Sequence, residues 1–351
     1  MELILFIVAI AFLIIVHELG HFLAAKVSRI KVQEFGIGFP PRVARLFRWG
    51  ETDFTLNAIP LGGFVRPAGE NDPTVAGGLA HANPWTRIFV LLAGPAMNIL
   101  FAFLLSSFIF FQIGKPDLTT VQVMQVAEGS PASIAGLESG DIIVQINDEE
   151  INSAEELHDE IYAHLGDLIE LTYLRDGESF TIGLTPRDPP PADEGAIGVT
   201  LGPARLPISG FEALSVGWQA IGEQANALIQ LPGRLISGQA SPDEGRLVGY
   251  KGMYDIYTEV RGVDAAESNL PPGINTMYFF ASISMSLGIL NLLPVPALDG
   301  GRILFTLPEI IFRRRIPAAY ENMVNLMGLA LLLLLIVYIN IQDFINPILV
   351  P

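Results

Sequence analysis

Apolar residues are concentrated in four long segments of the chain, at residues 3–25, 88–113, 277–293 and 323–345. A helix needs about 20 predominantly apolar residues to cross the hydrocarbon core of a bilayer, and each of the four segments reaches or approaches that length. The first segment would be about 35 Å long as a helix, at about 1.5 Å per residue. The pattern predicts a polytopic α-helical membrane protein with about four transmembrane helices.

The polar stretches between these segments have the patterns of small β structures. After the first segment, residues 32–39, 43–49 and 53–65 have the composition of short strands, and they predict a β-hairpin region. The stretch at 121–186 alternates strands and turns with a polar helix at 154–165 and further strands at 168–175 and 179–185. It predicts a separate α+β domain.

A further helix is expected beyond the stiff proline run at 189–191. Its apolar residues recur at steps of three and four with few charges between them, at Phe211, Leu214, Trp218, Ile221, Ala225 and Leu228. This spacing is typical of an amphipathic helix that lies in the membrane interface or packs on the preceding domain. The predicted organisation is 1–112 for two spans and the hairpin, 113–203 for the α+β domain, 204–275 for the amphipathic helix and linker, and 276–351 for the last two spans.

Composition and charge set the expected topology. The chain is 50% hydrophobic, has a net charge of −17 and contains no cysteine, so a metal would have to be held by nitrogen and oxygen ligands. The stretch between the first two spans carries eight basic and five acidic residues, whereas 114–275 carries eight basic and twenty-six acidic residues. Basic loops stay in the cytoplasm, so both termini and the acidic domain are expected outside. The acidity argues against a nucleic acid partner.

The sequence His17-Glu18-Leu19-Gly20-His21 lies inside the first apolar segment. Two histidines four residues apart share one face of a helix and can bind one zinc ion, while Glu18 beside them is a candidate general base. Ionisable residues at membrane depth are costly unless a metal, a partner or water compensates them, which favours a functional site. The alternatives are a chance match on an ordinary helix and a signal peptide, for which the basic n-region is missing.

A carboxylate that can complete the ligand set follows the third apolar segment. The stretch 291–301 reads NLLPVPALDGG, so Asp299 comes after two prolines that prevent a regular helix. Non-helical backbone at membrane depth is tolerated where it lines a polar cavity. A simple turn is the alternative for an Asp-Gly pair that follows a helix.

Together, His17–His21, the Gly94-Pro95-Ala96-Met97-Asn98 element and 291–301 resemble the site-2 protease family of intramembrane zinc metalloproteases, in its bacterial RseP-type branch. The resemblance implies His17, His21 and Asp299 as zinc ligands and Glu18 as the base that activates water. The stretch 59–65 resembles the family's hairpin, which implies a membrane-associated β-hairpin region. The resemblance also implies a set of residues that line the substrate cleft or pair with the substrate, namely Asn98, Asn291, Pro294, Pro296, Gly62 and Gly63. The alternatives are a helix-packing hydrogen bond for Asn98 and a purely structural hairpin around 59–65.

The α+β domain resembles a PDZ domain. The resemblance rests on Gly129-Ser130-Pro131-Ala132, Ala135-Gly136-Leu137 and Gly140-Asp141-Ile142-Ile143, and a single copy is visible. Such domains bind the ends of extended chains along a sheet edge.

The stretch 246–252 departs from the Gly-Pro-Val-Gly-Ile element of many relatives, which leaves its role open.

These features predict a zinc-dependent intramembrane endopeptidase that cleaves single-pass membrane proteins near the cytoplasmic face. The resemblance implies regulated intramembrane proteolysis, such as release of a membrane-held anti-sigma factor or clearance of signal-peptide remnants. It also implies a multi-pass protein of the bacterial inner membrane, with membrane lipid and PDZ-bound chain ends as further partners. The alternative from another class is a non-catalytic PDZ-bearing scaffold, and a metal transporter is the third candidate, although it would need polar residues along several spans.

Overall fold

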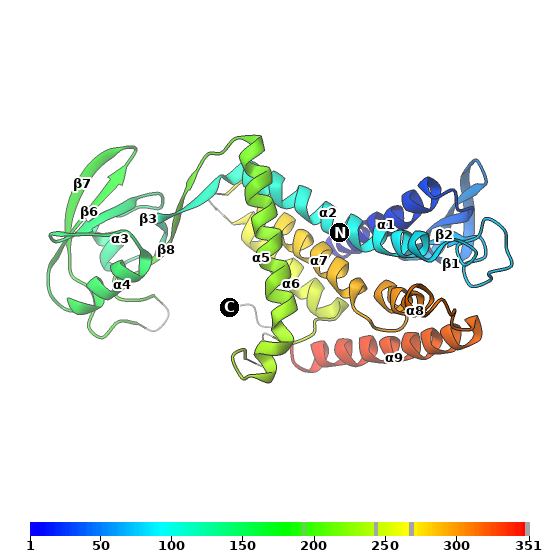
Figure 1. The fold of residues 1–351 in the computed structure, drawn as a ribbon. Helices are drawn as coiled ribbons and strands as arrows, with labels where there is room; N and C mark the ends of the chain where they lie inside the picture. Colours follow the sequence, from blue (N-terminus) through cyan, green and yellow to red (C-terminus); the bar gives the residue numbers. More distant parts are fainter. Residues whose placement is uncertain (192–193, 242–244, 267–269, 348–351) are drawn as a thin grey trace. The chain divides into compact units, whose positions relative to one another are not determined.

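The computed structural model describes residues 1–191, 194–241, 245–266 and 270–347 (Figure 1). The chain forms two compact units. One comprises Met1–Ile109 together with Leu214–Pro351, and the other comprises Phe110–Ala213.

Within the described residues, three helices of the chain are long and apolar enough to cross a membrane. They are α1 (Glu2–Val27), α2 (Pro84–Ile113) and α9 (Ala318–Ile345). The third predicted span is a helix as well, α7 (Ile274–Leu292), but it is not among these candidates. Its hydropathy is diluted by polar residues, namely Asn275, Thr276, Ser282, Ser284, Ser286 and Asn291. A total of four spans therefore stays a prediction.

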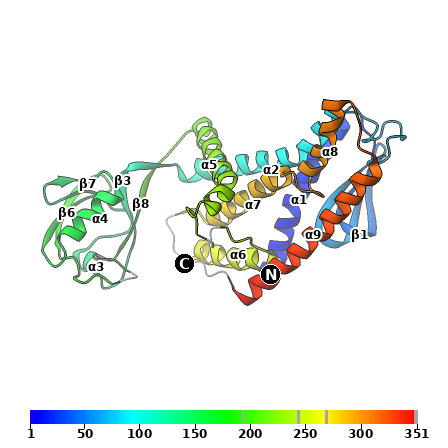
Figure 2. The ribbon, with the colours of Figure 1, turned by 60° about the horizontal axis from the view of Figure 1, so that its bottom comes forward.

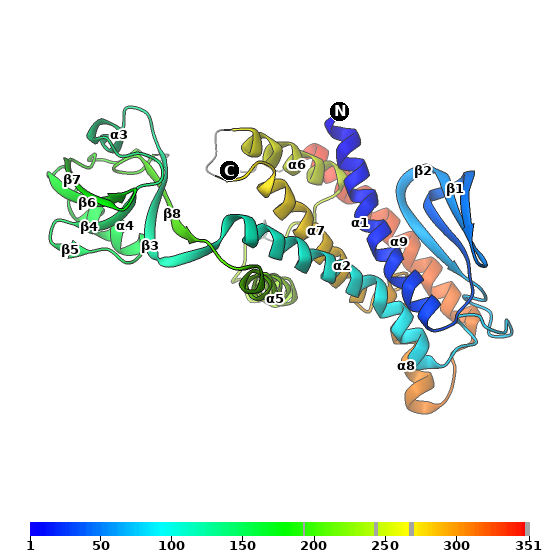
Figure 3. The same cartoon turned by 90° about the horizontal axis from the view of Figure 1, so that it is seen from above.

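The β-hairpin region consists of two long strands, β1 (Val32–Trp49) and β2 (Thr52–Pro67), which pair antiparallel. The expectation of two separate strands at 32–39 and 43–49 was wrong, because β1 continues through Pro40 and Pro41. The first part of β1 pairs with both halves of β2, so that Phe35 lies opposite Val65 and also opposite Phe54. The sheet lies along α1 (Figure 3), and Phe22 of α1 packs on both Phe35 and Phe54.

Helices α6 (Tyr250–Ala265), α7 and α8 (Asp299–Phe312) also belong to the first unit, as does α5 (Gly210–Ile236) from Leu214 onward. The predicted amphipathic helix is α5, on which Ile221 is buried while Phe211 and Trp218 are exposed. Helix α6 packs on α1 and α7 through Tyr257, which contacts Phe6 and Phe280.

The stretch 246–252 has a structural role at the start of α6, where α9 approaches it (Figure 2). The buried carboxylate of Asp343 in α9 accepts hydrogen bonds from the backbone N–H groups of Gly249 at 2.8 Å and Gly252 at 3.1 Å. Arg246 donates to the other oxygen of the same carboxylate at 3.2 Å. Since the first N–H groups of a helix have no partner within the helix, Asp343 acts as the cap of α6.

The second unit is a sheet with the strand order β7-β6-β4-β3-β8, with the short β5 (Glu149–Glu150) paired to β4 and with two helices, α3 (Pro131–Ala135) and α4 (Ala154–Ala163). Its longer strands are β3 (Lys115–Val126), β4 (Ile142–Ile146), β6 (Ile169–Arg175), β7 (Glu178–Leu184) and β8 (Val199–Leu206).

The predicted helix at 154–165 and strands at 168–175 and 179–185 are confirmed with small shifts of their ends. Helix α4 begins where Ser153 Oγ accepts from Glu156 N at 3.1 Å and the Glu156 side chain accepts from Asn152 N at 2.9 Å. Strand β8 was not predicted. It pairs with β3, more than 70 residues earlier in the chain.

Candidate metal centre

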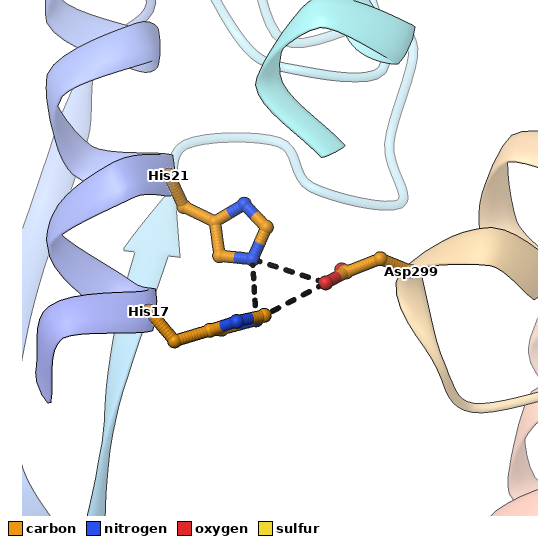
Figure 4. Close-up of side chains that lie close together, drawn as sticks. All are labelled: His17, His21 and Asp299. Carbon is orange, nitrogen blue, oxygen red and sulfur yellow. Dashed lines mark hydrogen bonds and ion pairs between the residues drawn. The ribbon is translucent and has the colours of Figure 1, made fainter. Parts of the chain in front are cut away.

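Helix α1 places the two histidines of the first segment on one face, with their rings directed to the same point. The Nε2 atoms of His17 and His21 lie 3.1 Å apart (Figure 4). This arrangement is the one expected for positions i and i+4, which lie about 40° apart around a helix. His17 is 9% exposed, so the pair lies inside the first unit rather than on its surface.

Asp299 comes to the histidines from the start of α8 (Figure 4). Its Oδ2 atom lies 3.1 Å from Nε2 of His17 and 3.3 Å from Nε2 of His21. The chain turns sharply before α8: a Cβ on Gly300 would lie 2.5 Å from the carbonyl carbon of Leu292, and a Cβ on Gly301 would lie 2.7 Å from that of Val295. Glycine at both positions therefore lets the turn close and bring the carboxylate to α1.

The three side chains fit a zinc ion. They form a group of two imidazoles and one carboxylate whose ligand atoms all lie within 4.8 Å of one another. Nitrogen and oxygen donors in a set of three suit a catalytic zinc, which keeps a further position for water or substrate. Gly94 of α2 leaves room for the group, because a Cβ there would lie 2.8 Å from Nε2 of His17 and would also press on His21.

Glu18 lies next to this group and contacts the hairpin sheet. Its Oε2 atom accepts a hydrogen bond from the backbone N–H of Val65 at 2.9 Å. A Cβ on Gly63, two residues earlier in β2, would lie 3.7 Å from Cγ of Glu18 and 3.0 Å from the carbonyl oxygen of Gly36. The predicted base therefore lies between the two histidines in sequence and beside β2 in space.

Comparison with known proteins shows the family of the chain. The sequence model of Peptidase family M50 matches residues 5–335. The chain belongs to peptidase family M50. It is therefore a zinc metalloprotease of the site-2 protease family, as the resemblance implied, and its candidate spans are consistent with a membrane location.

Relatives of this M50 peptidase come from several bacteria. A protein of Campylobacter jejuni that carries a zinc-metalloprotease name is 32% identical, over 96% of this chain and 91% of the relative. One of Clostridium perfringens with a name of the same kind is 31% identical, over 99% and 100%. The zinc metalloprotease RasP of Shouchella clausii is 27% identical, over 96% and 97%.

A solved structure matches a shorter part of the chain. The crystal structure of the PDZ domain of the SdrC-like protein from Listeria monocytogenes is 27% identical, covers 25% of this chain and 92% of that one, and has a TM-score of 0.22.

The cleft residues expected from the sequence lie in different places in the M50 peptidase. Asn98 of α2 is 1% exposed, and its Nδ2 atom lies 3.3 Å from Nδ1 of His17, on the side of the ring away from Asp299. Asn291 donates instead to the backbone oxygen of Leu287 in its own helix, at 2.9 Å.

The prolines and glycines of the predicted cleft lie near other elements. Pro296 packs on α9, where a Cβ on Gly328 would lie 2.7 Å from the Pro296 carbonyl oxygen, and Pro294 is exposed. Gly62 has a φ of +116°, and a Cβ on it would lie 3.4 Å from Ile14 of α1. Gly62 and Gly63 thus lie along α1. Contact of the substrate with the six predicted cleft residues stays a prediction.

Sequence reasoning gave no role to two residues of the site, Val90 and Gly94. The backbone oxygen of Val90 lies 2.8 Å from Nδ1 of His21, and Gly94 packs on both histidines. Val90, Gly94 and Asn98 follow one another at steps of four on α2. This spacing puts them on one face, and it is the signal that could have identified the side of α2 that packs on α1.

Proposed function

We propose that this M50 peptidase is an endopeptidase that hydrolyses a peptide bond within the transmembrane segment of single-pass membrane proteins. The observation that carries the proposal is the meeting of Asp299 with His17 and His21, which lie with Glu18 on a helix long enough to span a bilayer. A hydrolytic site at that depth has membrane-embedded chains as its natural substrates.

The proposed roles follow from the residue types. His17, His21 and Asp299 hold the zinc ion through two Nε2 atoms and one carboxylate oxygen. Bound zinc supplies a Lewis acid that polarises the scissile carbonyl and makes the attacking water more acidic. Glu18 takes the proton from that water and gives it to the nitrogen of the leaving amine, which can then depart as a neutral group.

The hairpin sheet supports the substrate after its helix has opened. Unwinding exposes N–H and C=O groups that have no water to bind in the hydrocarbon core, so they need partners from the protein. We propose that β2 supplies them near Gly62 and Gly63, since this part of the strand runs along α1 beside Glu18. Asn291, Pro294 and Pro296 are proposed to contact the substrate from the connection that leads to Asp299.

The proposed setting is the inner membrane of a bacterium, with four spans, both termini and a PDZ domain outside the cytoplasm. The separation of basic and acidic segments supports this orientation. In the proposed domain arrangement, residues 113–203 form the PDZ domain, which binds chain ends, 204–275 form an interfacial region in contact with lipid, and the spans in 1–112 and 276–351 carry the site. Substrates of this kind include a membrane-held anti-sigma factor and signal-peptide remnants.

The test is zinc content and cleavage of a model single-pass substrate by the purified, reconstituted protein. Glu18→Gln should keep zinc and lose activity by at least about a hundredfold, because the base is lost while the ligands remain. Asp299→Ala should lower zinc content and activity together, and Asp299→Asn should keep part of the zinc. Cleavage by Glu18→Gln at the wild-type rate, or full zinc content in Asp299→Ala, would overturn these roles.

A further inference from the structure

The side chain of Asn98 is held inside the first unit, on the far side of His17 from the metal-binding atoms. It is 1% exposed, and its Nδ2 atom lies 3.3 Å from Nδ1 of His17. Its other amide atom, Oδ1, is buried and has no hydrogen-bond partner among the described residues. A side chain with so little exposure is poorly placed to contact a substrate. It is well placed to form a hydrogen bond with the imidazole ring of His17.

Binding of a metal through Nε2 fixes the tautomer of His17. Nε2 of His17 lies 3.1 Å from the Asp299 carboxylate, and Nδ1 lies 3.3 Å from Nδ2 of Asn98. With the ring proton on Nε2, His17 donates a hydrogen bond to the carboxylate, and Nδ1 accepts one from the Asn98 amide N–H. A histidine that binds zinc through Nε2 carries its proton on Nδ1, and this N–H then needs an acceptor. Rotation of the Asn98 amide by about 180° exchanges its nitrogen and oxygen and provides one.

We propose that Asn98 is a positioning residue for zinc: its Oδ1 accepts the hydrogen bond from Nδ1–H of His17 and fixes the tautomer and the ring orientation that the metal requires. This inference rests on the proposed zinc site and revises the expected role of Asn98 as a substrate contact. Partners of this kind orient the ligands of metal sites, and their loss weakens metal binding about 10- to 100-fold.

The second histidine is held in the same way. Nδ1 of His21 lies 2.8 Å from the backbone oxygen of Val90, eight residues before Asn98 on α2. Helix α2 thus offers one partner to each histidine, a main-chain carbonyl for His21 and a side-chain amide for His17. The position of Asn98 is itself fixed, because Ser284 Oγ of α7 donates to its backbone oxygen at 2.9 Å.

The experiment compares Asn98→Leu, which keeps the branched shape of the side chain but has no polar atoms, with Asn98→Asp, which can only accept when ionised. Ser107→Ala is the matched control, since Ser107 is also buried on α2 and, among the described residues, its hydroxyl donates to the backbone oxygen of Phe103 in its own helix. Zinc affinity of the purified proteins is measured by competition with a chelating indicator, and KM and kcat are then measured at saturating zinc. We expect zinc affinity to fall about 10- to 100-fold in Asn98→Leu, with an unchanged KM. Asn98→Asp should stay within a few-fold of wild type, and Ser107→Ala should equal it.

Wild-type zinc affinity in Asn98→Leu, together with a raised KM, would overturn the inference in favour of a substrate contact. If Asn98→Leu does not fold, as judged by its thermal unfolding, Asn98→Asp decides: zinc binding more than about tenfold weaker than wild type would overturn the inference. His17→Ala is measured alongside. Unchanged zinc affinity in His17→Ala would contradict the proposed zinc ligands. Weak zinc binding in His17→Ala together with unchanged zinc binding in Asn98→Leu would contradict only the role of Asn98.

Discussion

The carboxylate of Glu18 and the backbone N–H of Val65 form a hydrogen bond in which Oε2 and N lie 2.9 Å apart. The bond joins the catalytic helix α1 to strand β2, which the proposed function assigns to substrate binding. Hydrogen bonds to charged groups contribute about 1.5–3 kcal/mol, enough to select one orientation of a side chain. The position of the proposed base therefore depends on the strand beside it.

Replacing Val65 by proline should lower activity and leave zinc in place. Proline removes the N–H that orients Glu18, and a loss of about 1.4 kcal/mol corresponds to about a tenfold lower kcat. Val65→Ala is the control, because it shortens the side chain and keeps the N–H. Equal cleavage rates for Val65→Pro and Val65→Ala at equal zinc content would show that this bond does not orient the base.

Gly94→Ala should weaken zinc binding. The added methyl group would lie 2.8 Å from Nε2 of His17 and would also press on His21, so the two rings would have to move apart or turn. Gly262→Ala on α6 is the matched control, since a Cβ there meets nothing within 4 Å and alanine favours a helix by about 1 kcal/mol. Zinc titration should show a loss in Gly94→Ala only. Full zinc affinity in Gly94→Ala would mean that the histidine rings are held less tightly than the structure shows.

The meeting of His17 and His21, two of the proposed metal ligands, could be predicted from the sequence because helix periodicity alone brings their side chains together. Asp299 was found through a helix-breaking stretch and a family resemblance, since its approach depends on a turn that no local pattern fixes. The contact of Val90 with His21 and the contact of Asn98 with His17 were not predicted for a related reason: the rotation of α2 against α1 decides which residues face the histidines. The contact of Gly94 with the two histidines likewise depends on how α2 packs on α1.

The strands show the limits of local patterns more directly. Separate strands were predicted at 32–39 and 43–49, yet β1 continues through Pro40 and Pro41 between them, with its two parts paired to β2. Proline cannot donate to a β ladder, so the continuation depends on the residues on either side. Strand β8 was missed because its partner β3 is distant in the chain and the proline run at 189–191 indicated a domain end. In both cases pairing with remote residues outweighed the local signal.

Helix α8, which carries Asp299, is tied to the segments before and within α2 by ion pairs. Arg302 of α8 lies 2.7 Å from Glu70, and Glu309 pairs with the buried side chain of Arg87. Arg302→Glu should weaken zinc binding, because like charges at 302 and 70 would push the start of α8 away from α1. The double exchange Arg302→Glu with Glu70→Arg should restore zinc affinity.

The control for this pair is Lys115→Glu, which breaks the exposed ion pair of Lys115 with Glu212 in the second unit. Exposed pairs contribute at most about 1 kcal/mol to stability, so this variant should bind zinc as the wild type does. A double exchange that binds zinc no better than Arg302→Glu alone would contradict a positioning role for the Arg302–Glu70 pair.

Substrates with glycine near the scissile bond should be cleaved faster than strictly poly-leucine ones. The scissile backbone can reach Glu18 and the metal ligands only after the substrate helix has opened. Glycine lowers the cost of opening by about 1 kcal/mol per residue relative to alanine, and leucine is close to alanine in this respect. Two glycines should therefore raise the cleavage rate by up to about 30-fold, because 1.4 kcal/mol corresponds to a factor of about ten.

The measurement uses one model substrate in three versions, with two leucines near the scissile bond kept, changed to alanine or changed to glycine. The alanine version separates helix opening from side-chain size, because alanine is small but favours a helix. We expect the leucine and alanine versions to be cleaved at similar slow rates and the glycine version to be cleaved fastest, with no cleavage by Glu18→Gln. If the alanine version is cleaved as fast as the glycine version, the site selects small side chains, and opening of the substrate helix does not limit the reaction.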